Sequence, residues 1–267
     1  MLGMNARAVR DLVGQLKMPV VCTYQGAGVV PRTMLALFGG RVGLFHNQPA
    51  DKLLDSADVV ATVGFDPIEY DPSLWNRGKR REIIHIDALP ADIDNDYRPA
   101  VELIGDIAAT LRELQAQVTA ELKIDEIPLL SAVRLEIESL RSQGEQLSGP
   151  RIHPLRLVSE LQKLLSDDMT ICCDMGSLHI WLMRYLYSFR PRQILITNGQ
   201  QTLGVGLPWA IAACLARPGE KVISLSGDGG FHFSAMELET AVRLKCHFVH
   251  LVWTRRLLRH GSHPTCR

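Results

Sequence analysis

The 267-residue sequence carries no excess of charge, because 29 lysines and arginines balance 29 acidic residues. This absence removes the long-range attraction that draws basic proteins to nucleic acids and anionic lipids. Long hydrophobic runs are also lacking: the longest extends only from Leu207 to Leu215, whereas a membrane-spanning helix needs about 20 apolar residues. The N-terminus has neither the apolar segment nor the cleavage site of a secretion signal. We therefore expect a cytoplasmic protein that binds neither nucleic acids nor membranes.

Two motifs that often reveal a cofactor are missing or incomplete. The six cysteines include no C-x-x-C spacing, and several lie in apolar runs, which favours a reduced environment. Gly26-Ala27-Gly28 starts like a dinucleotide-binding loop, but Val29-Val30-Pro31 follows where the pattern should continue. A structural turn is therefore the better interpretation of these glycines.

Short apolar runs alternate with helical patterns along most of the chain. With 46% hydrophobic residues the chain can bury a substantial core. The alternation predicts an α/β fold of two domains, each with a parallel sheet and crossover helices. The predicted strands are Pro19–Thr23, Val59–Phe65, Arg81–Asp87, Val101–Gly105, Met169–Cys173, Gln193–Thr197, Lys221–Ser226 and Phe248–Trp253. The predicted helices are Ala6–Lys17, Ala50–Ser56, Ile107–Glu121, Leu155–Leu165, Leu178–Tyr187, Gly204–Ala216 and Ser234–Leu244.

A change of pattern near Lys123 separates the two domains. The strongly charged helical stretch Ser131–Arg141 and the breaker Ser148-Gly149-Pro150 are typical of a linker. The expected division is an α/β domain at residues 1–124, a linker at 125–150, a second α/β domain at 151–254 and an arginine- and histidine-rich tail at 255–267.

A glycine-rich segment with one carboxylate, Gly227-Asp228-Gly229-Gly230, follows the apolar run Val222–Leu225. Glycines let backbone N–H groups approach phosphate oxygens, and the Asp228 carboxylate is a ligand that Mg²⁺ prefers. Ser234 and Glu237 have the spacing of a capping box, which predicts that a helix begins there. Because Asp-Gly is also common in turns, this segment alone does not define a site.

Two other polar, glycine-containing segments, 174–179 and 198–204, also follow predicted strands. The carboxyl ends of parallel strands meet at one edge of a sheet, where α/β proteins bind ligands. The three segments together therefore predict a site for a diphosphate and a metal ion at this edge.

The predicted metal site lacks a second ligand in the expected place. A further oxygen ligand would come from the segment after the next strand, but that segment begins with Arg255-Arg256. No asparagine follows Asn198, and no acid follows Glu239. Arginine cannot bind Mg²⁺, because its guanidinium is a permanent cation without a free lone pair. After Thr254 the chain becomes rich in arginine and histidine, unlike the sequence before it.

Eight longer stretches carry a resemblance to a known family. They are Thr23–Gln25, Gly43–Gln48, Val101–Asp106, Asp174–Ser177, Arg184–Arg190, Asn198–Thr202, Ser226–Phe231 and Met236–Val242. Together they resemble the thiamine-diphosphate-dependent acetolactate synthases, most closely the catabolic type that does not use FAD. The resemblance implies a middle domain with a nucleotide-binding-like fold at residues 1–124, followed by a truncated thiamine-diphosphate-binding domain at 151–254. Because the family-like sequence ends abruptly at Thr254, we interpret the unrelated tail at 255–267 as a shift of the reading frame.

The resemblance also implies roles for single residues. Asp228 would bind Mg²⁺, and the backbone of Gly229 and Gly230 would hold the diphosphate. Leu203 stands where the family places a bulky apolar side chain beneath the cofactor. The other implied cofactor contacts are His179, Gln200 and Thr202. For His179, a histidine on the surface of a helix is an equally good interpretation.

The implied reaction condenses two pyruvate molecules into 2-acetolactate and CO₂, with thiamine diphosphate and Mg²⁺ but without FAD, in a homo-oligomer. The family's catalytic glutamate lies in an N-terminal domain, so we expect no catalytic residue in this chain and no activity of the chain alone. The alternative is a non-catalytic binding or assembly module, left by truncation or a frameshift. A nucleotide-binding protein is a weaker alternative, because the glycine pattern is incomplete.

Overall fold

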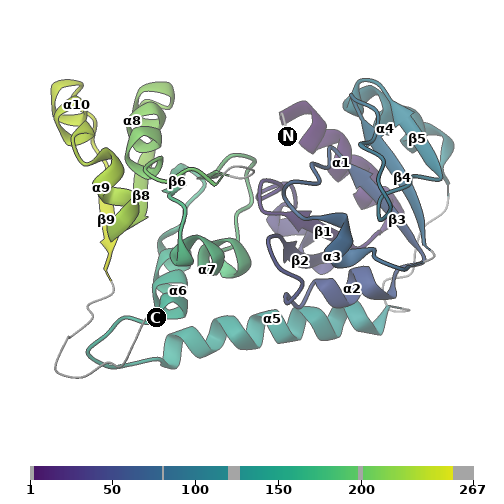
Figure 1. The fold of residues 1–267 in the computed structure, drawn as a ribbon, viewed down its shortest axis with the longest axis horizontal. Coiled ribbons are helices and arrows are strands. Elements are labelled where there is room, and N and C mark those ends of the chain that lie inside the picture. Colours follow the sequence, from purple (N-terminus) through teal and green to yellow (C-terminus); the bar gives the residue numbers. More distant parts are fainter. Residues whose placement is uncertain (1–2, 80, 120–126, 198–200, 255–267) are drawn as a thin grey trace.

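The computed structural model describes residues 3–79, 81–119, 127–197 and 201–254. Figure 1 shows two groups of helices and strands, with helix α5 (Pro128–Gln146) running alongside both. All paired strands in both groups are parallel and are accompanied by helices, which confirms the predicted α/β class. In the described part of the chain, no helix combines the length and apolar character needed to cross a bilayer.

The first group contains two small parallel sheets, where the sequence predicts one. The strands are β1 (Val20–Thr23) paired with β2 (Phe38–Val42), and β3 (Val59–Val63), β4 (Glu82–Asp87) and β5 (Val101–Ile104) in that order. The helices are α1 (Gly3–Leu16), the 3-10 helix η1 (Arg32–Leu37), α2 (Asp51–Ser56), α3 (Pro72–Trp75) and α4 (Ile107–Gln117). The main core of this group lies under α1 and α4, where Leu12 and Leu111 are buried together with Phe38.

The sequence does not predict strand β2, because two glycines interrupt its apolar pattern. The strand is nevertheless buried along its whole length. At Gly40 the backbone has a φ of +106°, and a Cβ atom there would lie 2.8 Å from Cδ1 of Ile137 in α5. Glycine is needed here because other residues disfavour this φ and would collide with the helix. A Cβ atom on the neighbouring Gly39 would collide with Cδ1 of Leu53 in α2, so close packing against two helices explains the glycines that conceal the strand.

Helix α5 occupies most of the segment that the sequence predicts to be a linker. Its buried side chains are Leu130, Val133 and Ile137. They pack with Leu53 of α2, which lies in the first group. Near its other end, Gly144 contacts helix α6 (Pro154–Leu164) so closely that a Cβ atom would lie 2.5 Å from the carbonyl oxygen of Leu155. The connection between the groups is therefore a helix packed against both.

The second group contains a parallel sheet with the order β7-β6-β8-β9. The strands are β6 (Met169–Cys173), β7 (Ile194–Ile196), β8 (Lys221–Gly227) and β9 (Val249–Trp253). The helices that follow α6 are α7 (Ser177–Tyr185), α8 (Gly206–Ala216), α9 (Asp228–Ser234) and α10 (Glu237–Arg243). Strand β6 is completely buried. Because β6 and β8 lead almost directly into α7 and α9, the first turns of these helices lie at the edge predicted to bind a ligand.

The predicted helix start at Ser234 is wrong. In the structure α9 already begins at Asp228 and Ser234 is its last residue, while α10 begins at Glu237 without a side-chain cap. The Ser234 hydroxyl is buried and makes no hydrogen bond to the described residues. Phe233 fixes the position of α9 instead, since a Cβ atom on Gly204 would lie only 2.6 Å from its Cβ atom. This packing outweighs the poor helix propensity of the glycine segment.

A buried arginine connects the two groups. Arg41 of β2 donates hydrogen bonds to the carbonyl oxygens of Met183 (2.9 Å) and Leu186 (2.7 Å) and to the hydroxyl of Ser188 (3.0 Å). These acceptors lie at the end of α7 and just after it. Burial lowers the pKa of Arg41 to about 10. Neutral oxygens, aligned by the end of a helix, therefore stabilise this charge.

Candidate functional site

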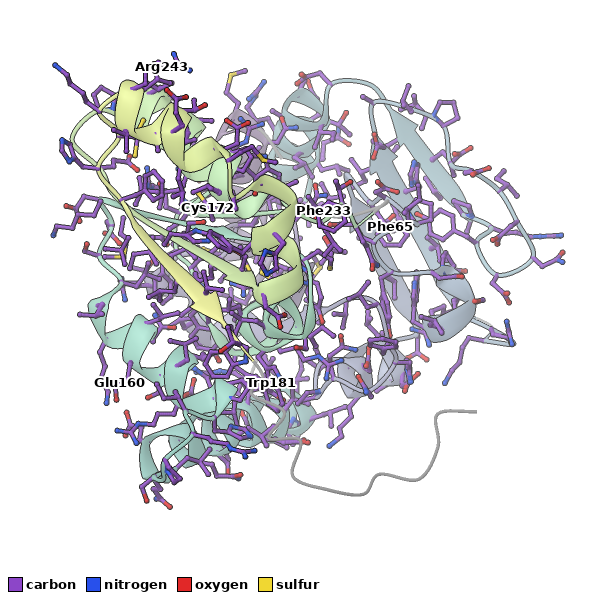
Figure 2. All side chains as sticks on the ribbon, turned by 60° about the vertical axis from the view of Figure 1, so that its left-hand side comes forward. Phe65, Glu160, Cys172, Trp181, Phe233 and Arg243 are labelled. Atoms are coloured by element: carbon purple, nitrogen blue, oxygen red, sulfur yellow. The ribbon has the colours of Figure 1, made fainter. Side chains whose placement is uncertain are left out.

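A cleft of about 1090 Å³ lies at the carboxyl ends of β6, β8 and β9. This volume is close to the upper end of the range of about 300–1,000 Å³ for small-molecule sites. The lining includes the first residues of α7 and α9, residues 150–152, the first residue of α6 (Pro154), and Trp181 and Trp253. Figure 2 shows the side chains around this region, with Trp181 below the helix that carries Phe233. A cleft large enough for a small molecule therefore lies at the predicted edge of the sheet.

Asp228 lines the cleft as the exposed first residue of α9. Its Oδ1 atom accepts a hydrogen bond from the backbone N–H of Gly229 at 2.9 Å. Its Oδ2 atom accepts none from the described residues. One carboxylate oxygen is thus held by the helix, and the other is available to a cation in the cleft.

The glycines around Asp228 differ in what surrounds them. A Cβ atom on Gly227 or Gly229 would meet no atom within 4 Å, so the space beside both backbones is open. A Cβ atom on Gly230 would lie 2.8 Å from Oδ2 of Asp174. Gly230 therefore has no side chain because Asp174 occupies that space. Beside Gly227 and Gly229, by contrast, there is room for a ligand. Such open backbone at a helix start suits phosphate oxygens.

The described side chains do not complete a metal site. Among these residues, no three His, Cys, Asp or Glu side chains lie together as a metal-binding group. Asp228 would therefore be one ligand among several, and a bound diphosphate would bring further oxygen ligands itself. The residues present fit a metal ion that arrives with a phosphorylated cofactor.

Comparison with known proteins agrees with this geometry. Residues 3–114 match the model of the thiamine pyrophosphate enzyme central domain, and residues 174–258 match that of the C-terminal TPP binding domain. The chain is 50% identical over 252 residues to acetolactate synthase of Bacillus subtilis (strain 168), an alignment that covers 92% of the chain. The chain belongs to the thiamine-diphosphate-dependent enzymes. Thiamine pyrophosphate and thiamine diphosphate are two names for one compound.

Other relatives of the chain carry similar names. It is 47% identical over 251 residues to the catabolic acetolactate synthase of Raoultella terrigena, which covers 93% of the chain. It is 32% identical over 236 residues to a probable acetolactate synthase large subunit of Methanocaldococcus jannaschii, which covers 84% of the chain. These findings confirm the resemblance seen in the sequence. The chain spans 39% to 45% of the length of these three relatives.

The structure brings most of the predicted cofactor contacts together. The predicted contacts that line the cleft are Leu203, Asp228, Gly229 and Gly230. Thr202 is exposed but does not line the cleft, and Gln200 lies outside the described residues. Leu203 is apolar and 40% exposed where it lines the cleft. The roles of these residues in cofactor binding stay predictions.

His179 does not line the cleft. It lies in α7, is fully buried, and contacts the ring of Tyr24 edge-on, with 5.6 Å between the ring centroids. Neither ring nitrogen has a hydrogen-bond partner among the described residues. Burial lowers its pKa to about 4, so the ring is neutral at pH 7. The interpretation of His179 as a surface histidine is wrong, and its contact with the cofactor stays a prediction.

A loop of the first group contacts helix α7 behind the cleft. Arg184 of α7 donates hydrogen bonds to Oδ1 of Asn47 (2.5 Å) and to the hydroxyl of Tyr24 (3.3 Å). Tyr24 in turn donates to Oε1 of Gln48, which is buried. These polar residues therefore hold α7 in place and do not line the cleft.

A second cavity, of about 220 Å³, separates β1 from β3 in the first group and has a largely apolar lining. The nearby turn at Gly26-Ala27-Gly28 has a structural cause. Gly28 has a φ of +88°, and a Cβ atom there would collide with the backbone of Arg190 in the second group. This glycine is thus required by packing between the groups.

The sequence assigns no role to Asp174, which lies at the centre of the site. Asp174 directly follows the buried strand β6, is only 2% exposed, and lines the cleft. An acid at the end of a buried apolar strand, close to glycine-containing segments, is the signal in the sequence that could have identified it. Only the structure shows which groups it binds.

Proposed function

We propose that this chain forms the middle domain and the diphosphate-binding domain of an acetolactate synthase, with residues 125–150 as the linker. The reaction is the condensation of two pyruvate molecules into 2-acetolactate and CO₂. The observation that carries the proposal is the open backbone at Gly227 and Gly229, beside a carboxylate and an exposed leucine in one cleft. The names of the acetolactate synthases that match the chain support it.

Each part of the cleft has its own task in this proposal. The backbone of Gly229 and Gly230 accommodates the diphosphate, and Asp228 binds Mg²⁺. Leu203 would contact the bound cofactor, and Trp181 and Trp253 would exclude water from the cleft that they line. When bound, thiamine diphosphate supplies the nucleophilic carbon that pyruvate requires, and the protein binds and orients it.

We propose further that the chain alone does not turn over pyruvate, uses no FAD, and is active only in a homo-oligomer of longer chains. In the described residues, the cleft contains no glutamate that could act as the family's catalytic acid. The second candidate is a non-catalytic binding or assembly module. The lack of a complete metal-binding group among the described side chains favours it.

Tryptophan fluorescence tests the proposal, since Trp181 and Trp253 line the cleft. We expect thiamine diphosphate to quench the fluorescence with saturation and Mg²⁺ to tighten binding. In the presence of Mg²⁺, Asp228→Asn should weaken the binding of thiamine diphosphate by about tenfold or more, a change of about 1.4 kcal/mol or more in the free energy of binding. The matched control is Asp92→Asn, an exposed acid in the first group, which should bind like the wild type.

The outcomes separate the two candidate functions. Absence of saturable quenching, or equal binding by Asp228→Asn and the wild type, would contradict the proposed site. Binding without formation of acetolactate from pyruvate agrees with a domain of a longer synthase. Robust turnover by the chain alone would show that the expectation of inactivity is wrong.

A further inference from the structure

Asp174 binds three backbone amides from two separate segments. Its Oδ1 atom accepts hydrogen bonds from the N–H groups of Met175 (2.8 Å) and Gly204 (2.9 Å). Its Oδ2 atom accepts one from the N–H of Gly206 at 3.3 Å. Its own N–H donates to the carbonyl oxygen of Leu225 in β8 at 2.8 Å. A buried carboxylate is costly unless such donors surround it, so this arrangement is specific to the folded state.

The same carboxylate contacts a third segment. A Cβ atom on Gly230 would lie 2.8 Å from Oδ2 of Asp174, and one on Gly206 would lie 3.2 Å from its Cβ atom. Asp174 therefore fills the space between the end of β6, the start of α8 and the first turn of α9. Each of these segments also contributes to the cleft, through Met175, Leu203 and Gly229 respectively.

Leu203 depends on this contact in particular. It is 40% exposed, so neighbouring side chains alone do not fix its position. The next residue, Gly204, has a φ of +83° and is held by its N–H bond to Asp174. Loss of that bond would free the backbone directly beside Leu203, in a conformation that only glycine adopts easily.

We propose that Asp174 is a positioning residue that fixes Leu203 and the Gly229-Gly230 backbone in the geometry that binds thiamine diphosphate. It does not contact the diphosphate itself, because backbone amides already occupy both of its oxygens. The inference rests on the proposed function for its ligand, but the arrangement of the three segments can be tested without any ligand.

Asp174→Asn is the informative variant, because it keeps the shape and one acceptor oxygen but replaces the other by an N–H₂ group. That group would face the N–H of Gly206, donor against donor. We expect amide hydrogen exchange, followed by NMR, to accelerate at Gly204, Gly206 and Gly229, while Ile171 in the centre of β6 stays protected. Affinity for thiamine diphosphate with Mg²⁺, measured by tryptophan fluorescence, should fall by about tenfold or more.

Gly230→Ala serves as a second variant if Asp174→Asn does not fold. Its methyl group would push on the carboxylate from the opposite side, and we expect faster exchange at Gly204 although that residue is unchanged. Asp92→Asn is again the control and should leave exchange and affinity unaltered.

Two results would overturn the inference. One is exchange that accelerates uniformly through the sheet or not at all, because Asp174 would then be a general structural residue or dispensable. The other is faster local exchange with unchanged affinity for thiamine diphosphate. If the wild type binds no thiamine diphosphate, the proposed function of the isolated chain fails, and the exchange pattern alone decides whether Asp174 positions the three segments.

Discussion

Single residues in this chain have roles that depend on burial more than on residue type. Asp228 and Asp174 are both acids that follow strands at the same edge, but one is exposed and the other is 2% exposed. The exposed carboxylate can bind a cation, whereas the buried one binds backbone amides. His179 is a third case, since burial without a hydrogen bond keeps its ring neutral.

His179 should make stability depend on pH. Its pKa is lowered from 6.5 to about 4, so below pH 6.5 the unfolded chain takes up a proton that the folded chain accepts only near pH 4. The free energy of unfolding should therefore fall as the pH decreases from 6.5 toward 4, by about 2 kcal/mol at pH 5. Urea unfolding at pH 7.5 and pH 5 measures this difference.

His179→Phe should reduce the pH dependence of the free energy of unfolding, because phenylalanine fits an apolar site and does not titrate. His247→Gln, which replaces an exposed histidine, should leave it unchanged. An equal loss of stability at pH 5 in His179→Phe and the wild type would contradict the assignment.

At the scale of elements, close approach between helices and strands accounts for several glycines. In β2, Gly39 allows the close approach of α2 and Gly40 that of α5, and in α5 Gly144 allows that of α6. The sequence predicts the helices and most strands because their apolar periods are local. It does not predict β2, and it places the start of the helix after β8 at the wrong residue, because contacts distant in the sequence decide both.

Two Gly→Ala substitutions in helices should have opposite effects. At Gly14 in α1, the nearest atom to a new Cβ would be Cε of Met34 at an ordinary 3.6 Å. Gly14→Ala should therefore raise the free energy of unfolding by about 0.5–1 kcal/mol through helix propensity. At Gly144 a Cβ atom would lie 2.5 Å from the carbonyl oxygen of Leu155. Gly144→Ala should therefore lower the free energy of unfolding by about 1–3 kcal/mol.

Urea unfolding of both variants at one pH checks this contrast. Each variant is the control for the other, because the substitution is the same and both sites are helical. An increase of stability in both would show that α5 and α6 can separate at no cost.

At the scale of the whole molecule, polar contacts hold the two groups together. Arg41 is 5% exposed and donates three hydrogen bonds to the end of α7 and the residues after it. A second arginine, Arg184 of α7, donates a hydrogen bond from the second group to Asn47 in the first. Since α7 lines the cleft with its first turn, the first group supports the site without entering the cleft.

Arg41→Met should weaken the coupling between the groups. Methionine fills similar space but leaves the carbonyl oxygens of Met183 and Leu186 without their donor. We expect a loss of about 3 kcal/mol in the free energy of unfolding and two calorimetric transitions in place of one. Arg77→Met, at an exposed arginine, is the control. A single transition at the temperature of the wild type would contradict this role.

The sequence by itself determined the α/β class, the edge of the sheet that carries the cleft, and the family. These follow from local periods, from glycines beside an acid after a strand, and from long matching stretches. The tertiary structure alone decided that Asp174 binds Gly204 and Gly206, 30 and 32 residues away, and that Arg41 reaches α7. Such contacts arise from how layers pack, and no property of neighbouring residues along the chain encodes which buried polar group meets which partner.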